Sequence, residues 1–84
     1  MSDIEALKAS CAIEEIDILD LQTTQVNIDN QDIKVVYNNL NVASRNHLRS
    51  FANALTLVGI TYVPQYLTAE AYQAIVSTPI ERGN

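Results

Sequence analysis

Residues 31–58, QDIKVVYNNLNVASRNHLRSFANALTLV, contain neither glycine nor proline and carry apolar residues three and four positions apart. That spacing gathers the apolar residues on one face of an α-helix. The face consists of Ile33, Val36 or Tyr37, Leu40, Ser44, His47, Phe51, Leu55 and Val58. Gly59 follows directly and belongs to the residue type that most often ends a helix. The sequence therefore predicts a long helix over about residues 31–58, with Ser44 and His47 as polar interruptions at its centre.

The residues that precede this helix predict another one, over about residues 3–25. Ser2 and Glu5 have the spacing of a capping box, which satisfies the first backbone N–H groups of a helix. The expected inner face is made of Leu7, Cys11, Glu14, Ile18 and Leu21. The stretch VNIDN at 26–30 contains Asn and Asp, which favour turns and helix caps. Two long helices joined by so short a turn must lie antiparallel, as a hairpin.

The sequence beyond the hairpin predicts an extended strap followed by a short helix. Residues 60–67, ITYVPQYL, are mostly β-branched or aromatic and are divided by a proline, which favours an extended segment lying over a helix end. Tyr62 and Tyr66 are the expected anchors of this strap. A short helix is expected over residues 69–77, and residues 78–84 are expected to form a loose tail.

The size of the chain bears on its assembly. A chain of 84 residues buries a modest fraction of its surface, so a single domain spanning residues 1–84 is expected. Each helix of the hairpin covers only part of the other's apolar face, so the open side needs a partner. The predicted fold class is all-α: a long antiparallel helical hairpin plus a short C-terminal helix, which completes a four-helix bundle by dimerisation. The expected partner is a second copy, giving a homodimer, or a separate chain that supplies the other hairpin.

Composition disfavours several classes of partner. The net charge is −5 and the five Lys and Arg residues are spread along the chain, whereas nucleic-acid binding needs clustered cations. No stretch approaches the roughly 18 apolar residues of a membrane-spanning helix, so no membrane partner is expected. The start, MSDIEALK, has neither the positive charge nor the apolar run of a secretory signal, and a cytoplasmic location is expected. Cys11, the single cysteine, is expected to be buried and inert. Arg45 and Arg49 fall off the inner face and are expected to pair with surface carboxylates.

Two ionisable residues interrupt the apolar faces and are the candidate functional residues. A buried carboxylate such as Glu14 needs a metal ion, an arginine or a shared proton. Counting along an antiparallel hairpin places Glu14 opposite about positions 40–44, within one turn of His47. A glutamate and a histidine at the same depth of a helical bundle are potential metal ligands. The alternative interpretation is a hydrogen-bonded core histidine beside a partly exposed Glu14; Glu15 takes the place of Glu14 if the helical phase differs by one residue.

Three stretches resemble a known family: AIEEIDILDL at 12–21, ASRNHLRSF at 43–51 and TYVPQYL at 61–67. Together they resemble domain of unknown function 2202, a ferritin-like group, over about residues 4–76, and they match its C-terminal half. The resemblance implies a ferritin-like four-helix bundle. In each half of such a bundle, a Glu on one helix and a Glu-x-x-His pair on the next supply metal ligands.

This resemblance assigns metal ligands residue by residue. The first Glu corresponds to Glu14 or Glu15, and the His of the pair corresponds to His47. Ser44 stands where the pair has its Glu, and a neutral serine is a poor replacement for a bridging carboxylate, which argues against a full di-iron site. If two chains dimerise about a twofold axis, two Glu and two His meet at the bundle centre. That set suits one metal ion, iron or zinc, or two weakly held ions.

Two functions follow as hypotheses. The first is a ferritin-like metal-binding bundle protein assembled from two hairpins, which binds and oxidises iron if the metal keeps an open coordination position. The alternative is a non-enzymatic helical interaction or assembly module without bound metal, whose polar core residues only fix the register of the helices. A conventional hydrolase is disfavoured, because the sequence has no nucleophile, histidine and acid set on loops, no glycine-rich phosphate loop and no CxxC motif.

Overall fold

The structure, a computed structural model, describes residues 3–26 and 29–82; Ser2 of the expected capping box and two residues of the expected turn lie outside these ranges. The described residues form helices α1 (Asp3–Val26), α2 (Gln31–Leu57) and α3 (Ala69–Val76), and no strand. No helix within these ranges is long and apolar enough to cross a membrane. The all-α prediction is confirmed. The three observed helices differ from the expected ranges by a single residue at their C-terminal ends.

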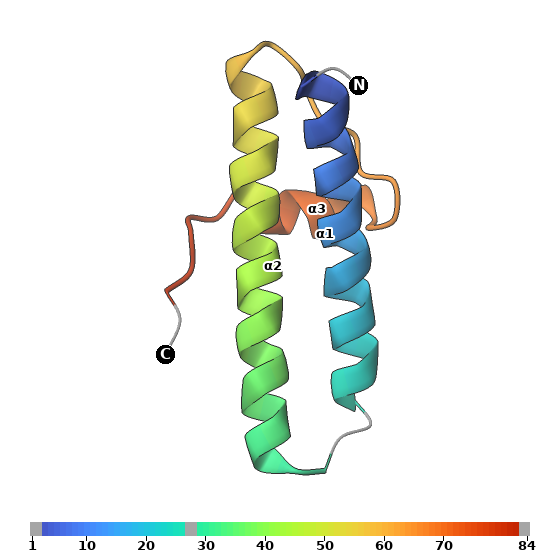
Figure 1. The fold of residues 1–84 in the computed structure, drawn as a ribbon, viewed down its shortest axis with the longest axis vertical. Coiled ribbons are helices and arrows are strands. Elements are labelled where there is room, and N and C mark those ends of the chain that lie inside the picture. The colour runs from blue at the N-terminus through green and yellow to red at the C-terminus, as the bar shows by residue number, and fades with distance from the viewer. Residues whose placement is uncertain (1–2, 27–28, 83–84) are drawn as a thin grey trace.

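The two long helices form an antiparallel hairpin (Figure 1). Asn30 caps α2, because its side-chain oxygen accepts hydrogen bonds from the backbone N–H groups of Asp32 and Ile33 at 2.9 and 3.2 Å. Gly59 ends the same helix with φ +82°, a left-handed conformation that glycine adopts without steric cost. The N–H of Gly59 donates to the Thr56 carbonyl, and the N–H of Ile60 donates to the Leu55 carbonyl, both at 2.9 Å. This pair of bonds is the Schellman arrangement.

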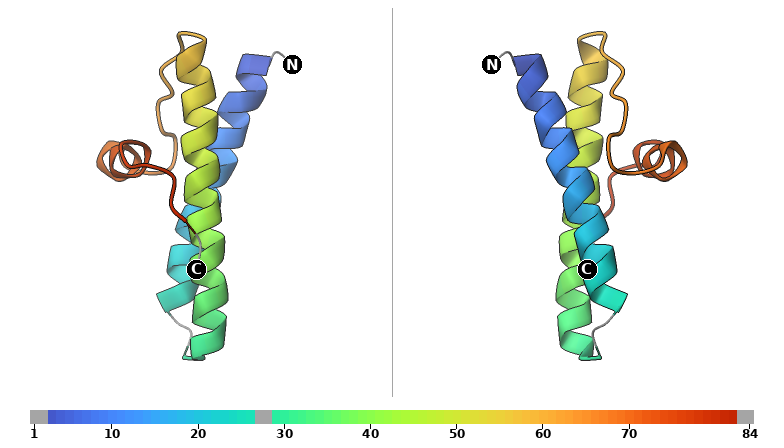
Figure 2. Two further views of the ribbon diagram at one scale, coloured as in Figure 1. Left: turned by 90° about the vertical axis from the view of Figure 1, so that its left-hand side faces the viewer. Right: turned by 90° about the vertical axis from the view of Figure 1, so that its right-hand side faces the viewer.

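The strap and α3 cover one side of the hairpin. Figure 2 shows α3 standing off from the paired helices on one side, with no other described element on the opposite side. The buried apolar residues are Cys11, Ile18, Leu48, Ala52, Leu55, Tyr62, Leu67 and Tyr72. They come from both long helices, the strap and α3, so the core lies on the covered side. The expected burial of Cys11 is confirmed, and this burial raises the pKa of its thiol to about 11.

Two local expectations about the C-terminal third are wrong. Tyr66 is 54% exposed and therefore does not anchor the strap with its side chain, whereas Tyr62 and Leu67 are buried. The tail was expected to be loose, but within the described residues it is attached to α2. Glu81 forms hydrogen bonds with Arg45 and with two other α2 side chains. Both errors concern contacts between residues far apart in the chain, which helical spacing does not encode.

Candidate functional site

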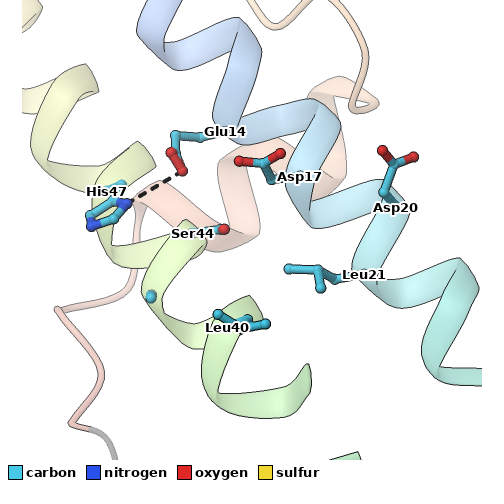
Figure 3. A pocket seen from close by; sticks show the side chains of 8 residues that line it. Glu14, Asp17, Asp20, Leu21, Leu40, Ser44 and His47 are labelled. Carbon is cyan, nitrogen blue, oxygen red and sulfur yellow. Dashed lines mark hydrogen bonds and ion pairs between the residues drawn. The ribbon is translucent and has the colours of Figure 1, made fainter. Parts of the chain in front are cut away.

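A groove with a volume of about 530 Å³ runs between α1 and α2. The residues that line it are Glu14, Asp17, Asp20, Leu21, Leu40, Ala43, Ser44 and His47. Figure 3 shows these side chains between the two helices, with α3 behind them. The groove therefore opens on the side of the hairpin that α3 leaves uncovered (Figure 2).

Glu14 and His47 meet in this groove, as antiparallel pairing of the two helices predicts. The Nδ1 atom of His47 lies 3.4 Å from Oε1 of Glu14. The Glu14 side chain is 10% exposed and the His47 side chain is 62% exposed. The structure thus reverses the burial expected in the alternative interpretation, which placed the histidine in the core and the glutamate at its edge.

The Glu14 carboxylate is buried but poorly satisfied. A separation of 3.4 Å is long for a hydrogen bond, so His47 gives Glu14 a weak partner. Burial raises the pKa of the Glu14 carboxyl above its usual value, although the hydrogen bond and the charge of His47 act in the opposite direction. A buried carboxylate in this condition favours the approach of a positive ligand, because such a ligand offsets the cost of removing the charge from water.

Glu15 faces the other side of the hairpin and is fully satisfied. Its carboxylate accepts a hydrogen bond from the Tyr62 hydroxyl at 2.5 Å and bonds from the backbone N–H groups of Gln65, Tyr66 and Leu67 at 3.1, 3.0 and 2.9 Å. Burial raises the pKa of the Glu15 carboxyl, but these hydrogen bonds outweigh burial and hold the pKa below its usual value. The carboxylate that faces the groove is therefore that of Glu14, and Glu15 is the anchor of the strap.

The remaining predicted ligand, Ser44, also lines the groove. It is buried, at 7% exposure, and its hydroxyl is neutral. Asp17, three residues after Glu14, adds an exposed carboxylate to the groove wall, and Asp20 adds another. No group of three or more His, Cys, Asp or Glu side chains within the described residues is placed to hold a metal ion. The described part of one chain thus brings together two of the predicted ligands, Glu14 and His47.

A second polar cluster lies on α2 away from the groove, and sequence reasoning predicted its arginines but missed their partner. The predicted pairing of Arg45 and Arg49 with a carboxylate is correct, and the partner is Glu81, at 2.6 and 2.8 Å. The Arg49 side chain is only 8% exposed, so this is not a surface ion pair. The hydrogen bonds and charges of both arginines lower the pKa of Glu81 to about 2. The spacing of the two arginines was the available signal, but nothing in the sequence pointed to Glu81 as their partner.

Comparison with known proteins identifies the family. A family model described as an uncharacterized protein domain, DUF2202, matches residues 1–79. The chain belongs to this family. The predicted family membership is confirmed, whereas the ferritin-like relationship stays a prediction.

A curated relative and a solved structure carry the same protein name. The chain is 46% identical over 82 residues to the uncharacterized protein MJ0754 of Methanocaldococcus jannaschii. It also resembles the crystal structure of the hypothetical protein MJ0754 from Methanococcus jannaschii, with a TM-score of 0.90 at 44% identity. These matches cover 98% and 96% of this chain but only 44% and 46% of the relative. The chain thus spans less than half the length of the relative that it matches.

Proposed function

We propose that this DUF2202 chain is one half of a ferritin-like metal-binding bundle, completed when the groove side of a second copy docks against its own. The observation that carries the proposal is the meeting of Glu14 and His47, 3.4 Å apart, in a groove on the uncovered side of the hairpin. Docking of a second hairpin there buries the pair and doubles the number of ligands. Both residues lie at mid-length of their helices, so a twofold axis through the groove brings the two pairs close together.

The two side chains present fit half of a metal site. Two ligand atoms bonded to one tetrahedral ion at about 2.0–2.2 Å lie about 3.3–3.6 Å from each other. The observed 3.4 Å between Glu14 Oε1 and His47 Nδ1 falls in that interval. Two protein ligands are too few for a structural site, but two copies supply two carboxylates and two imidazoles, which suits zinc or iron. A bound iron with an open coordination position would supply ferrous-iron oxidation as its chemistry.

The surface around the pair supports docking of a second hairpin. Val36, Leu40 and His47 lie on one face of α2 by helical spacing, and the two apolar residues are 55% and 47% exposed. Apolar side chains gathered around a groove indicate an interaction site more often than a solvated surface. The length of MJ0754 agrees with this, because the match accounts for 46% of that chain and leaves room for further elements beside the matched hairpin.

Metal content and solution mass, measured on the same sample, test the proposal. We expect the wild type to be a dimer that retains zinc or iron at about one ion per two chains after dialysis, because four ligands complete one tetrahedral site. Glu14→Gln and His47→Ala each remove one ligand from every chain and are expected to lose the ion.

Two variants serve as matched controls for this experiment. Glu70→Gln changes an exposed carboxylate on α3, and Asn53→Ala truncates an exposed side chain of α2, so both should retain metal as the wild type does. Equal metal content in wild type and His47→Ala would refute the metal site. A monomeric wild type at concentrations of tens of micromolar would refute completion by a second copy.

A second candidate function is an assembly module without metal, and Ser44 favours it. A metal-binding Glu-x-x-His pair would need a carboxylate at that position, and the buried serine carries none. The two candidates differ in the melting temperature measured with and without a chelator. A ligand that binds only the folded state raises stability, so the metal-binding bundle should melt at a lower temperature in the chelator, whereas the assembly module should not change.

A further inference from the structure

The groove wall formed by α1 carries three carboxylates, Glu14, Asp17 and Asp20, which we call the acidic wall. They follow one another at intervals of three residues, so neighbouring members are about 5–6 Å apart at their Cβ atoms. Burial, and after it the charge of Asp17, raises the pKa of the Glu14 carboxyl, so these two carboxylates repel each other within one chain. No described residue that lines the groove is a lysine or an arginine.

The positively charged residues of the chain lie away from the acidic wall. Successive residues of an α-helix are about 100° apart, so Lys8 is about 120° around α1 from Glu14. By the same count, Lys34 is about 140° around α2 from His47. The two arginines of α2 are paired with a carboxylate of the tail, and Arg82 lies in the tail itself. The charges are therefore segregated, with three carboxylates and no lysine or arginine among the described residues of the groove.

Ser44 marks the groove as a ligand site independently of these charges. It is 7% exposed, and its hydroxyl forms no hydrogen bond with any described residue. Figure 3 shows this hydroxyl between the two helices, directed toward α1. Glu14 and His47 are paired across the groove. Because the helices run in opposite directions, Asp17 and Ser44, each three residues nearer the interhelical turn, are level as well. A carboxylate and a free hydroxyl oxygen thus face the same part of the groove, and divalent cations accept both as ligands.

We propose that a second copy docks on the groove only when divalent cations bridge the two acidic walls, so that cation binding controls assembly of the bundle. This inference rests on the proposed function, which places a second copy on the groove. In a twofold interface, each patch meets the same patch of the partner. Docking therefore brings together six carboxylates, three from each copy, and removes them from water. Like charges placed in this way oppose association strongly.

Divalent cations remove this obstacle and supply attraction in its place. An ion held by Glu14 and His47 of both copies offsets the charges of the two glutamates at the centre of the interface. Asp17 and the Ser44 hydroxyl offer oxygen ligands beside it, and a hard cation such as Mg²⁺ needs only one or two carboxylates when water completes its coordination. The acidic wall thus opposes the dimer without cations and binds the bridging ions when cations are present.

The test is the dissociation constant of the dimer, measured on the full chain by analytical ultracentrifugation. We expect the wild-type dimer to be at least about tenfold tighter with added Zn²⁺ and Mg²⁺ than in EDTA. In EDTA, Asp17→Asn should form a dimer at least about tenfold tighter than the wild type, because each dimer loses two of its opposed charges. The control is Glu70→Gln, which removes one charge from an exposed position of α3 and should leave the dissociation constant unchanged.

Salt provides a second measurement that needs no substitution. In EDTA, raising NaCl from about 0.1 M to 1 M shortens the Debye length from about 10 Å to 3 Å, which screens the repulsion between the acidic walls. The wild-type dimer should therefore become tighter, and the change should be smaller in Asp17→Asn/Asp20→Asn, which has less repulsion to screen. An interface held by ion pairs would show the opposite response to salt.

The outcomes separate this inference from the proposed function. A wild-type dimer with the same dissociation constant in EDTA and with the two cations would overturn the inference alone and leave the groove-to-groove dimer standing. An Asp17→Asn dimer no tighter than the wild type in EDTA would also overturn it, because the acidic wall would then not oppose docking. A wild type that stays monomeric with both cations present would refute completion by a second copy, and the inference with it.

Discussion

Glu14 and Glu15 are adjacent carboxylates on α1, both buried, and they face opposite sides of the hairpin. Glu15 accepts hydrogen bonds from a hydroxyl and three backbone N–H groups, and its pKa is lowered. Glu14 has the weak contact with His47, and its pKa is raised. Burial alone therefore does not separate a structural carboxylate from a candidate ligand. The number and quality of the hydrogen bonds already made by the carboxylate separate them.

The largest expected effect is the loss of stability when the charge of Glu15 is removed. In Glu15→Gln, the amide NH₂ faces hydrogen-bond donors, which leaves buried N–H groups unsatisfied and should lower the free energy of unfolding by about 2–4 kcal/mol. Glu14→Gln removes a poorly satisfied buried charge and should change it by less than about 1 kcal/mol. Urea unfolding in chelator measures both. Equal losses in the two variants would contradict the distinction between anchor and candidate ligand.

A smaller effect separates the two tyrosines that the sequence proposed as anchors. Tyr62→Phe removes the hydroxyl that donates to the Glu15 carboxylate, and a hydrogen bond to a charged group contributes about 1.5–3 kcal/mol. Tyr66→Phe is the matched control, because that side chain is 54% exposed and should lose almost nothing. The same urea titration measures both variants. A larger loss in Tyr66→Phe than in Tyr62→Phe would contradict the assignment of Tyr62 as the tyrosine whose side chain anchors the strap.

The sequence predicts the helices better than it predicts the contacts between them. Spacing of apolar residues, the cap at Asn30 and the stop at Gly59 act over a few residues, so the helix bounds follow from local physics. Antiparallel geometry then brings Glu14 to His47, because a hairpin with a short turn has one register. This part of the candidate site was accessible from the sequence.

The contacts of the tail and the strap were harder to predict from the sequence, because they join residues far apart in the chain. Glu15 bonds to residues about fifty positions away, and the choice between Glu14 and Glu15 turns on roughly 100° of rotation about α1. Glu81 is a single charge in a segment without periodicity, and its partners are thirty-two and thirty-six positions earlier. Only the three-dimensional arrangement shows that Arg45 and Arg49 bind Glu81.

The response to pH should also distinguish the carboxylates. Glu15 and Glu81 have lowered pKa values, so each stabilises the fold above its unfolded pKa of 4.5, and this stability is lost as the pH falls through the folded value, which is about 2 for Glu81. Glu14 has the opposite sign, because its raised pKa favours folding at low pH and opposes it once the pH exceeds the folded value.

Melting temperatures of the wild type, Glu81→Gln and Glu14→Gln, measured from neutral pH down to pH 3, check these signs. Glu81→Gln should flatten the acid loss of the wild type, because the variant lacks one group that must take up a proton. Glu14→Gln should steepen it, because the variant lacks the group that acts in the opposite direction. The same pH profile in all three proteins would show that these carboxylates do not carry the linkage.

The smallest expected effect is that of His47→Ala on the metal-free chain. The histidine is 62% exposed and its contact with Glu14 is long, at 3.4 Å, so the contact is worth at most about 1 kcal/mol and the free energy of unfolding in chelator should barely change. Asn53→Ala, an exposed truncation on the same helix, provides the baseline. A loss of several kcal/mol in His47→Ala would mean that His47 satisfies Glu14 as Tyr62 satisfies Glu15. The two carboxylates would then both be structural, and the reason to seek a metal ion between the helices would be gone.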